Sequence, residues 1–198
     1  MNERQIIIVV LVIIGIALLW YAANKPAEIK EYDARNFVIN DVQGKYPEGD
    51  IEVLSTNFSA GSYKIKVKAT LNASFPCPER IHLYYDYPAQ QFATGLPEHI
   101  TKDCKVCINV PDCVLIFPEE ALIASHTFPG TEEIAQFLQE HPSATGTVTV
   151  VPVYETYSNV WNIEWGEWNG PEVQGQYVIL DDRGRVLEVG DWGSDAKS

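Results

Sequence analysis

The chain has 198 residues, a formal net charge of −13, 46% hydrophobic residues and 21% charged residues. This composition is typical of a globular protein with one ordinary domain or two small ones, and it excludes an intrinsically disordered chain. Nucleic acids bind clustered Lys and Arg side chains, so the large acidic excess argues against a nucleic-acid partner.

The first feature along the chain is an uncharged apolar stretch at residues 6–23. Eighteen helical residues would span ~27 Å, close to the ~30 Å hydrocarbon core of a bilayer, and Trp20 and Tyr21 stand where an interfacial aromatic belt would fall. A cleaved signal peptide is the competing interpretation, but Tyr21 would then occupy a cleavage-site position that requires a small residue. The stretch therefore predicts a single-pass transmembrane helix in contact with the lipid bilayer.

Weaker signals indicate on which side of the membrane the rest of the chain would lie. Positive charges flank the apolar stretch on both sides, and their count alone does not choose a side. The even number of cysteines and the two N-x-[ST] sequons, at Asn57 and Asn72, favour an external location for the C-terminal part. We therefore expect a cell-membrane protein with an extracytoplasmic domain, in which Asn57 and Asn72 are candidate glycosylation sites.

Residues 28–88 follow with the pattern of one helix and three strands. Apolar residues at rough helical spacing precede the turn sequence PEGD at residues 47–50. Strands are predicted over residues 50–61, 62–71 and 80–87, each bounded by turn residues or by proline.

The strand predicted at residues 62–71 alternates strictly between lysines and less polar residues. Its two faces hold Lys64, Lys66 and Lys68 on one side and Tyr63, Ile65, Val67 and Ala69 on the other. This alternation is typical of a half-buried strand. We interpret the lysines as a solvated strand face, and the alternative is a docking patch for a partner protein.

Residues 131–191 repeat the order of one helix and three strands. Thr131 is a favourable N-cap for a helix over residues 131–142. The following strands carry Trp161, Ile163 and Trp165 in alternation, which predicts that these three side chains face the core. Trp168 lies in the turn-like sequence GEWNGPE and is the better candidate for an exposed binding surface.

The second of these units resembles a PepSY-like domain. The stretches that carry the resemblance are EEIAQFLQEHP at 132–142, VWNIEW at 160–165 and YVILDDRGRVLEV at 177–189, the last with the family's closing strand, Asp-x-x-Gly turn and Val-Leu pair. Residues 28–88 form a weaker repeat that lacks this turn. The resemblance implies a small helix-on-sheet module outside the cytoplasm, associated with protein binding or inhibition and without catalytic residues.

An insert at residues 89–130 separates the two units and contains three of the four cysteines. A connection of this length requires its own structure or cross-links. We favour two structural disulfides among Cys77, Cys104, Cys107 and Cys113, with one bridge from Cys77 into the insert and one closing a small loop within it. Pro118, followed by two glutamates, predicts the start of a helix.

Two other interpretations of the cysteines stay open. A metal site would recruit ligands from a set of thiols and imidazoles: Cys77, Cys104, Cys107, Cys113, His99 and His126. A redox C-x-x-C motif usually lies at a helix N-terminus, whereas the sequence after Cys107 is extended and contains Pro111.

The sequence contains no nucleophile elbow, zinc-protease motif or phosphate-binding loop, and we assign no catalytic residue and no cofactor. The predicted fold class is α+β, with an N-terminal transmembrane helix followed by two α-β-β-β units of helix on antiparallel sheet and the Cys-containing insert between them. The predicted boundaries are 1–27 for the anchor and juxtamembrane segment, 28–88 for the first unit, 89–130 for the insert, and 131–198 for the second unit with a short tail.

These features favour a membrane-anchored, non-enzymatic module of the cell envelope that binds a protein partner of unknown identity. The first alternative is a metal-dependent or redox module built on the cysteine insert. The second alternative is a structural subunit of the cell surface.

Overall fold

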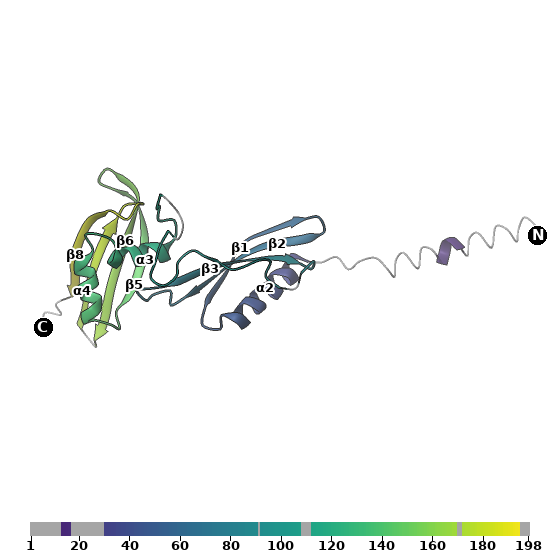
Figure 1. The fold of residues 1–198 in the computed structure, drawn as a ribbon, viewed down its shortest axis with the longest axis horizontal. Coiled ribbons are helices and arrows are strands. Elements are labelled where there is room, and N and C mark those ends of the chain that lie inside the picture. The colour runs from purple at the N-terminus through teal and green to yellow at the C-terminus, as the bar shows by residue number, and fades with distance from the viewer. Residues whose placement is uncertain (1–12, 17–29, 91, 108–111, 170–171, 195–198) are drawn as a thin grey trace, which may run out of the picture.

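The computed structural model describes residues 13–16, 30–90, 92–107, 112–169 and 172–194. They form two four-stranded antiparallel sheets with the strand orders β1-β2-β3-β4 and β5-β6-β7-β8 (Figure 1). The first sheet belongs to residues 50–99 and the second to residues 145–194, and the helices lie against these sheets.

The predicted fold class is wrong in two respects. Each unit has four strands instead of three. Within the described ranges, no helix is long and apolar enough to cross a membrane, so the predicted transmembrane helix is not supported. Of the segment 6–23, only residues 13–16 are described, as helix, and the remainder lies outside the described residues.

The first unit places one helix against its sheet. Its elements are α2 (Glu31–Lys45), β1 (Asp50–Ser59), β2 (Ser62–Leu71), β3 (Glu79–Tyr87) and β4 (Glu98–His99). Acidic residues in the first turn of α2 and Lys45 in its last turn complement the helix dipole. Val38 and Val42 of α2 are fully buried with Ile65, Val67 and other apolar residues of the sheet. The predicted alternation of β2 is confirmed on its apolar face.

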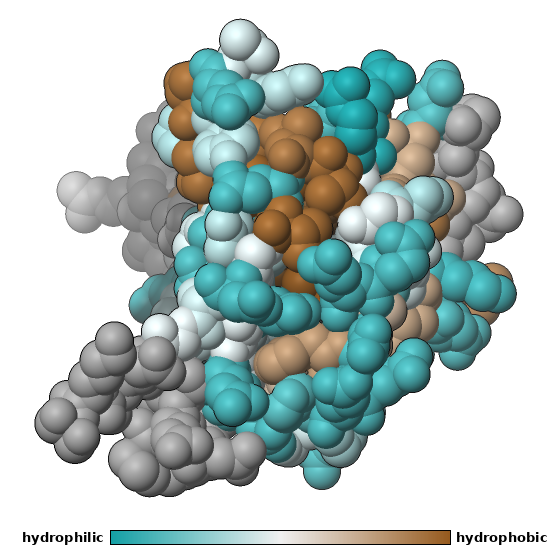
Figure 2. Space-filling view, turned by 90° about the vertical axis from the view of Figure 1, so that its left-hand side faces the viewer, coloured by the Kyte–Doolittle hydropathy of each residue, from teal (hydrophilic) through white to brown (hydrophobic). Residues whose placement is uncertain are grey.

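The second unit covers its sheet with two helices. Its elements are α3 (Pro118–Thr127), α4 (Glu132–Glu140), β5 (Thr145–Tyr154), β6 (Tyr157–Asn169), β7 (Glu172–Leu180) and β8 (Val186–Ser194). Trp161, Ile163 and Trp165 of β6 are buried in its core, as their alternation predicts. Figure 2 views this end of the molecule and shows a hydrophobic band bordered by polar side chains.

The fourth strand of each unit has a different origin. β4 has only two residues, too few to produce an alternation pattern in the sequence. β8 arises because the chain reverses after β7: Asp181 Oδ1 accepts hydrogen bonds from the backbone N–H groups of Arg183, at 3.0 Å, and Arg185, at 2.8 Å. Gly184 then takes a positive φ of 76°, and the chain continues as a full fourth strand, β8.

Helix α3 differs from the other helices because every residue from Glu119 to Ser125 is buried. A helix that is buried all round lies between other elements instead of on the surface. On one side, Leu122 belongs to the core of the second sheet, and a Cβ added at Gly146 would lie 2.5 Å from its Cδ2. On the other side, Glu119 contacts the first sheet, so α3 joins the two units.

Both cysteine pairs are disulfide bonds. Cys77–Cys104 links the segment before β3 to the insert, and Cys107–Cys113 closes a loop inside the insert. The predicted disulfides and their favoured pairing are therefore confirmed. The first bridge holds the insert against the first unit at the junction where α3 also makes contact.

Candidate functional site

The candidate site lies on the face of the first sheet that points away from α2, which we call the polar face. Because side chains alternate along a strand, Lys64, Lys66, Lys68 and Thr70 of β2 all belong to it. Their antiparallel partners on β1 and β3 extend the same face. These partners are Asp50, Glu52, Ser55, Asn57, Arg80, His82, Tyr84 and Asp86.

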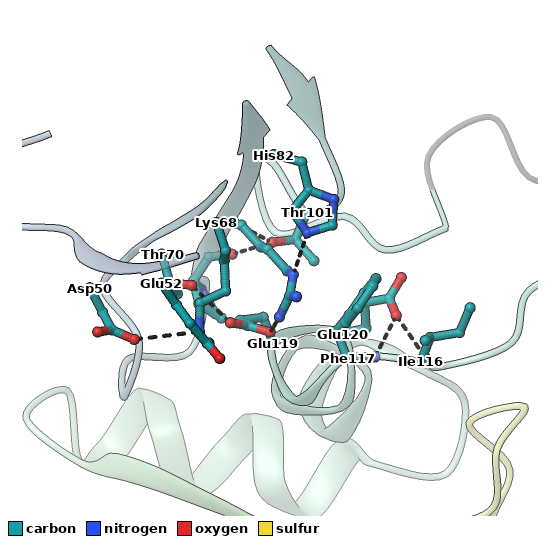
Figure 3. Close-up of polar contacts among 12 residues, drawn as sticks. Asp50, Glu52, Lys68, Thr70, His82, Thr101, Ile116, Phe117, Glu119 and Glu120 are labelled. Atoms are coloured by element: carbon teal, nitrogen blue, oxygen red, sulfur yellow. Dashed lines mark hydrogen bonds and ion pairs between the residues drawn. The ribbon is translucent and has the colours of Figure 1, made fainter. Parts of the chain in front are cut away.

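Helix α3 covers one end of the polar face, and we call this the closed end. Figure 3 shows Glu119 of α3 together with Lys68 and Thr70 of the first sheet. Arg80 Nη1 donates to Glu119 Oε2 at 2.9 Å, and Thr70 Oγ1 donates to Glu119 Oε1 at 2.9 Å. Arg80 and Glu119 are only 5% and 6% exposed. A buried ion pair is stable only when both charges are compensated, so each partner depends on the other.

Aromatic and backbone contacts complete the closed end. The Arg80 guanidinium lies 3.7 Å from the centre of the Phe117 ring, within the range of a cation–π contact. Thr101 accepts a hydrogen bond from the backbone N–H of Arg80 and donates one to the carbonyl of Pro78, both at 2.8 Å. The insert therefore meets the first sheet through specific polar contacts.

His82 is buried beside this ion pair. Arg80 Nε donates to His82 Nε2 at 3.0 Å, so this ring nitrogen is an acceptor. Desolvation, reinforced by the positive charges of Lys66 and Arg80, lowers the pKa of His82 from 6.5 to about 4. The imidazole is therefore neutral at pH 7 and supports the arginine as an acceptor.

Lys68 belongs to the closed end, and it is buried. Its ammonium lies 2.9 Å from Glu52 Oε2 and 3.5 Å from Asp50 Oδ2 on β1. The hydrogen bond from Lys68 lowers the pKa of Glu52. Lys68 is thus engaged by two carboxylates of β1 within the sheet.

The other end of the polar face is open and forms a groove of about 410 Å³, which we call the open groove. It is lined by residues of β1, β2 and β3 and by Thr94 of the following loop. The lining residues are Ser55, Asn57, Lys64, Ile65, Lys66, Tyr84, Tyr85, Asp86 and Thr94. The β1 strand shifts its register between Val53 and Ser55, at the edge of this groove.

The two lysines of the open groove are in different electrostatic states. Lys64 pairs with Asp86 and lowers the pKa of that carboxyl group. Lys66 has no ion pair among the described residues, and its ammonium lies 5.3 Å from the centre of the Tyr84 ring. Tyr84 donates to Glu98 Oε2 at 2.5 Å, and this hydrogen bond is the main cause of the lowered pKa of Glu98. The charge of Lys66 also contributes to the lowered pKa of Glu98, although the two groups form no ion pair.

The structure places the other predicted surface residues as follows. Asn57 is exposed on β1 and lines the open groove, whereas Asn72 is exposed in the turn after β2, with a positive φ of 54°. Trp168 belongs to β6, where it pairs with Val173, but its side chain lies outside the described residues. The two sequons are thus separated, and only Asn57 adjoins the candidate site.

The residues predicted as an alternative metal site are only partly brought together. One donor atom each of Cys77, Cys104 and His126 lies within 4.8 Å of the other two. Cys107 and Cys113 bond to each other, and His99 lies in β4. The full predicted set of six ligands is therefore not one cluster.

A second polar cluster occurs in the second unit, where the sequence pattern gave no prediction. His141 Nδ1 lies 2.6 Å from Glu167 Oε2, and Ser143 also hydrogen-bonds to Glu167. A nucleophilic serine requires a hydrogen bond to its base. Here both the serine and the histidine contact the carboxylate, so the cluster ties the start of β5 to β6 and has no arrangement for acyl transfer.

Sequence reasoning missed the residues that organise the polar face, chiefly Arg80, Glu119, Tyr84 and Thr101. A signal was present in RIHLYYDY at residues 80–87, where Arg80, His82, Tyr84 and Asp86 alternate as polar or amphipathic residues. This period of two indicates a second polar strand next to the lysine strand. The contact with Glu119, 39 residues further along the chain, leaves no local signal.

No known protein-family model, curated protein or solved structure matches this chain at a significant level. The function must therefore be argued from the geometry of the polar face.

Proposed function

We propose that the protein is a non-enzymatic binding module whose open groove receives an extended, acidic segment of a partner protein. The observation that carries this proposal is the pairing pattern on the polar face. The closed end is internally neutralised by Arg80–Glu119 and by Lys68 with its two acids, whereas Lys66 in the open groove has no ion pair among the described residues.

The lining of the groove supports a peptide ligand over a small metabolite. Ser55, Asn57 and Thr94 supply neutral donors and acceptors, and Tyr84 supplies an aromatic surface, a mixture typical of protein-recognition surfaces. The groove follows β1, which is an edge strand of the first sheet. An extended segment lying there reaches both the edge strand and the lysines.

Electrostatic complementarity supports an acidic ligand segment in spite of the overall charge. The chain carries a net charge of −13, which disfavours association with acidic partners in general. Lys66 makes no ion pair among the described residues and lies in the groove, so it offers an acidic side chain a compensating charge at this position.

The predicted family resemblance and the predicted extracytoplasmic location are compatible with this proposal and remain predictions. The resemblance of residues 131–191 to PepSY-like domains agrees with a binding role, and the disulfides agree with an extracytoplasmic location. Neither feature names a partner.

The proposal is tested by selecting a phage-displayed library of random peptides on the purified full chain. We expect enriched peptides with two or more Asp or Glu residues, and we expect Lys66→Glu to weaken their binding at least about tenfold by replacing attraction with repulsion. The matched control is Lys102→Glu, because Lys102 is exposed in the insert and outside the groove. Peptides without an acidic bias, or equal losses in both variants, contradict the proposal.

A further inference from the structure

A cluster of three soft donor atoms lies at the junction of the two units, apart from the open groove. Cys104 Sγ lies 3.5 Å from His126 Nε2, and Cys77 shares the disulfide with Cys104. All three donor atoms lie within 4.8 Å of one another. The elements that hold them are far apart in the sequence: the segment before β3, the insert and helix α3.

The orientation of His126 suits a ligand role. Its Nδ1 lies 3.0 Å from the carbonyl oxygen of Leu122 one turn earlier in α3, so Nδ1 carries the proton and the Nε2 lone pair faces the sulfur. A backbone carbonyl at the second ring nitrogen is the usual support for a metal-bound histidine. The ring is also fixed by an edge contact with Trp165, with centroids 5.9 Å apart.

The distances match the requirements of a tetrahedral metal site. Zn–S bonds of ~2.3 Å and Zn–N bonds of ~2.0–2.1 Å at the tetrahedral angle place sulfur and nitrogen ~3.5 Å apart. The observed separation of Cys104 Sγ and His126 Nε2 is 3.5 Å. The two sulfurs must move apart, which becomes possible once the bond between them is broken, and the Cys77 sulfur already lies within 4.8 Å of the histidine nitrogen.

We propose that Cys77, Cys104 and His126 form a redox-gated site for a thiophilic cation such as Zn²⁺, closed while the disulfide is intact and opened by its reduction. A dithiol reductant breaks the sulfur–sulfur bond by two successive exchanges: it becomes a disulfide and gives two electrons and two protons to the cysteines. The cation then displaces the two thiol protons and binds two thiolates and one neutral imidazole. A water molecule completes the fourth position.

Reduction leaves most of the junction in place. The Arg80–Glu119 pair, the Thr101 hydrogen bonds and the packing of α3 against the second sheet do not depend on the disulfide. Cys77 is at least partly exposed, so a reductant reaches the bond without unfolding of the chain. The protein thus keeps the three donors together in both redox states.

The test uses the full chain with Cys107→Ser and Cys113→Ser, which leaves a single disulfide. Co²⁺ is titrated into the oxidised protein and into protein reduced by a water-soluble phosphine. We expect one Co²⁺ per chain only after reduction, with sulfur-to-cobalt charge-transfer absorption and the intense visible bands of tetrahedral cobalt. His126→Asn is expected to weaken this binding at least about tenfold, and His99→Asn, the matched control, to leave it unchanged.

Near-UV circular dichroism of the buried tryptophans accompanies each titration and reports whether the fold is retained. A folded, reduced protein that binds no cobalt overturns the proposal. Equal affinity in the His126→Asn variant overturns it too, because the cation would then bind the thiols alone. Loss of the tryptophan signal on reduction also contradicts the proposal, because the site requires the junction to persist.

Discussion

The two units share a plan but differ in the sheet face that points away from their helices. Each unit packs helix against one face of a four-stranded antiparallel meander. In the second sheet, Trp192 lies across Gly166 and Gly175, where an added Cβ would be 2.9 and 2.2 Å from its ring. In the first sheet, the corresponding face carries lysines, carboxylates and the open groove.

This difference supports the proposal that the first unit carries the binding surface. On the outer face of the second sheet, Trp192 packs onto Gly166 and Gly175, and Tyr177 packs onto Gly190. The first sheet leaves charged groups around an unfilled groove and neutralises only the end that α3 covers. Two units with a similar architecture thus differ in their exposed faces: the second contributes α3 to the junction, and the first carries the polar face that we propose as the binding surface.

The largest expected effect tests whether the closed end holds the units together. Glu119→Ala leaves the Arg80 guanidinium buried without its carboxylate, which costs about 3–5 kcal/mol of unfolding free energy. Chemical denaturation measures this loss. The matched control is Glu31→Ala, which removes an exposed ion pair with Arg35 and is expected to cost less than about 0.5 kcal/mol. Equal small losses in both variants would show that the closed end contributes no specific stability.

The next effect compares the two disulfides. Replacing Cys77 and Cys104 with Ala removes a bridge that spans 27 residues, and the chain-entropy model gives a loss of about 3–4 kcal/mol. Replacing Cys107 and Cys113 removes a bridge that spans 6 residues, for which the same model gives about 2 kcal/mol. Denaturant midpoints of the two double variants decide the order, and the reverse order would contradict the assignment of Cys77–Cys104 as the junction bridge.

A smaller effect concerns pH and is centred on the first unit. His82 has a pKa of about 4 in the folded chain against 6.5 in the unfolded chain. Between these values the unfolded state binds more protons, so stability falls as the pH decreases from 6.5 to 4, by up to about 3 kcal/mol. His126 in α3 has a lowered pKa and acts in the same direction.

The variant His82→Gln separates the contribution of His82 to the pH dependence of stability from that of His126, because glutamine does not titrate. Unfolding free energies of the wild type and the variant are measured at intervals from pH 7 to pH 4. We expect a weaker pH dependence in the variant, and a parallel decline in both proteins would show that His82 is not the titrating group.

The sequence predicted the features that depend on local patterns and missed those that depend on contacts between distant parts of the chain. The alternation of β2, the buried tryptophans of β6, the helix start at Pro118 and the disulfide pairing follow from local patterns or from spacing. The pairing of Arg80 with Glu119 does not, because it joins a strand to a helix of the other unit. The all-round burial of α3 conceals the period that usually reveals a helix face.

The fourth strand of each unit and the open groove were also not predicted from the sequence. β4 is too short to carry a pattern, and β8 depends on a turn in which the Asp181 side chain accepts two backbone hydrogen bonds. The sequence shows the three lysines of β2 as one alternating set. The structure gives them three different states: Lys68 is buried, Lys64 is paired with Asp86, and Lys66 has no ion pair among the described residues. These states depend on the neighbouring strands β1 and β3, which the alternation of β2 does not reveal.

Backbone amide chemical shifts of the full chain, recorded during titration with a selected acidic peptide, test the central claim most directly. We predict that the perturbed amides cluster on β1, β2 and β3 around Ser55, Asn57, Lys66 and Tyr84, and that the amides of β6, β7 and β8 stay unchanged. Perturbations centred on the second sheet, with the open groove unaffected, would contradict the assignment of the polar face as the binding surface.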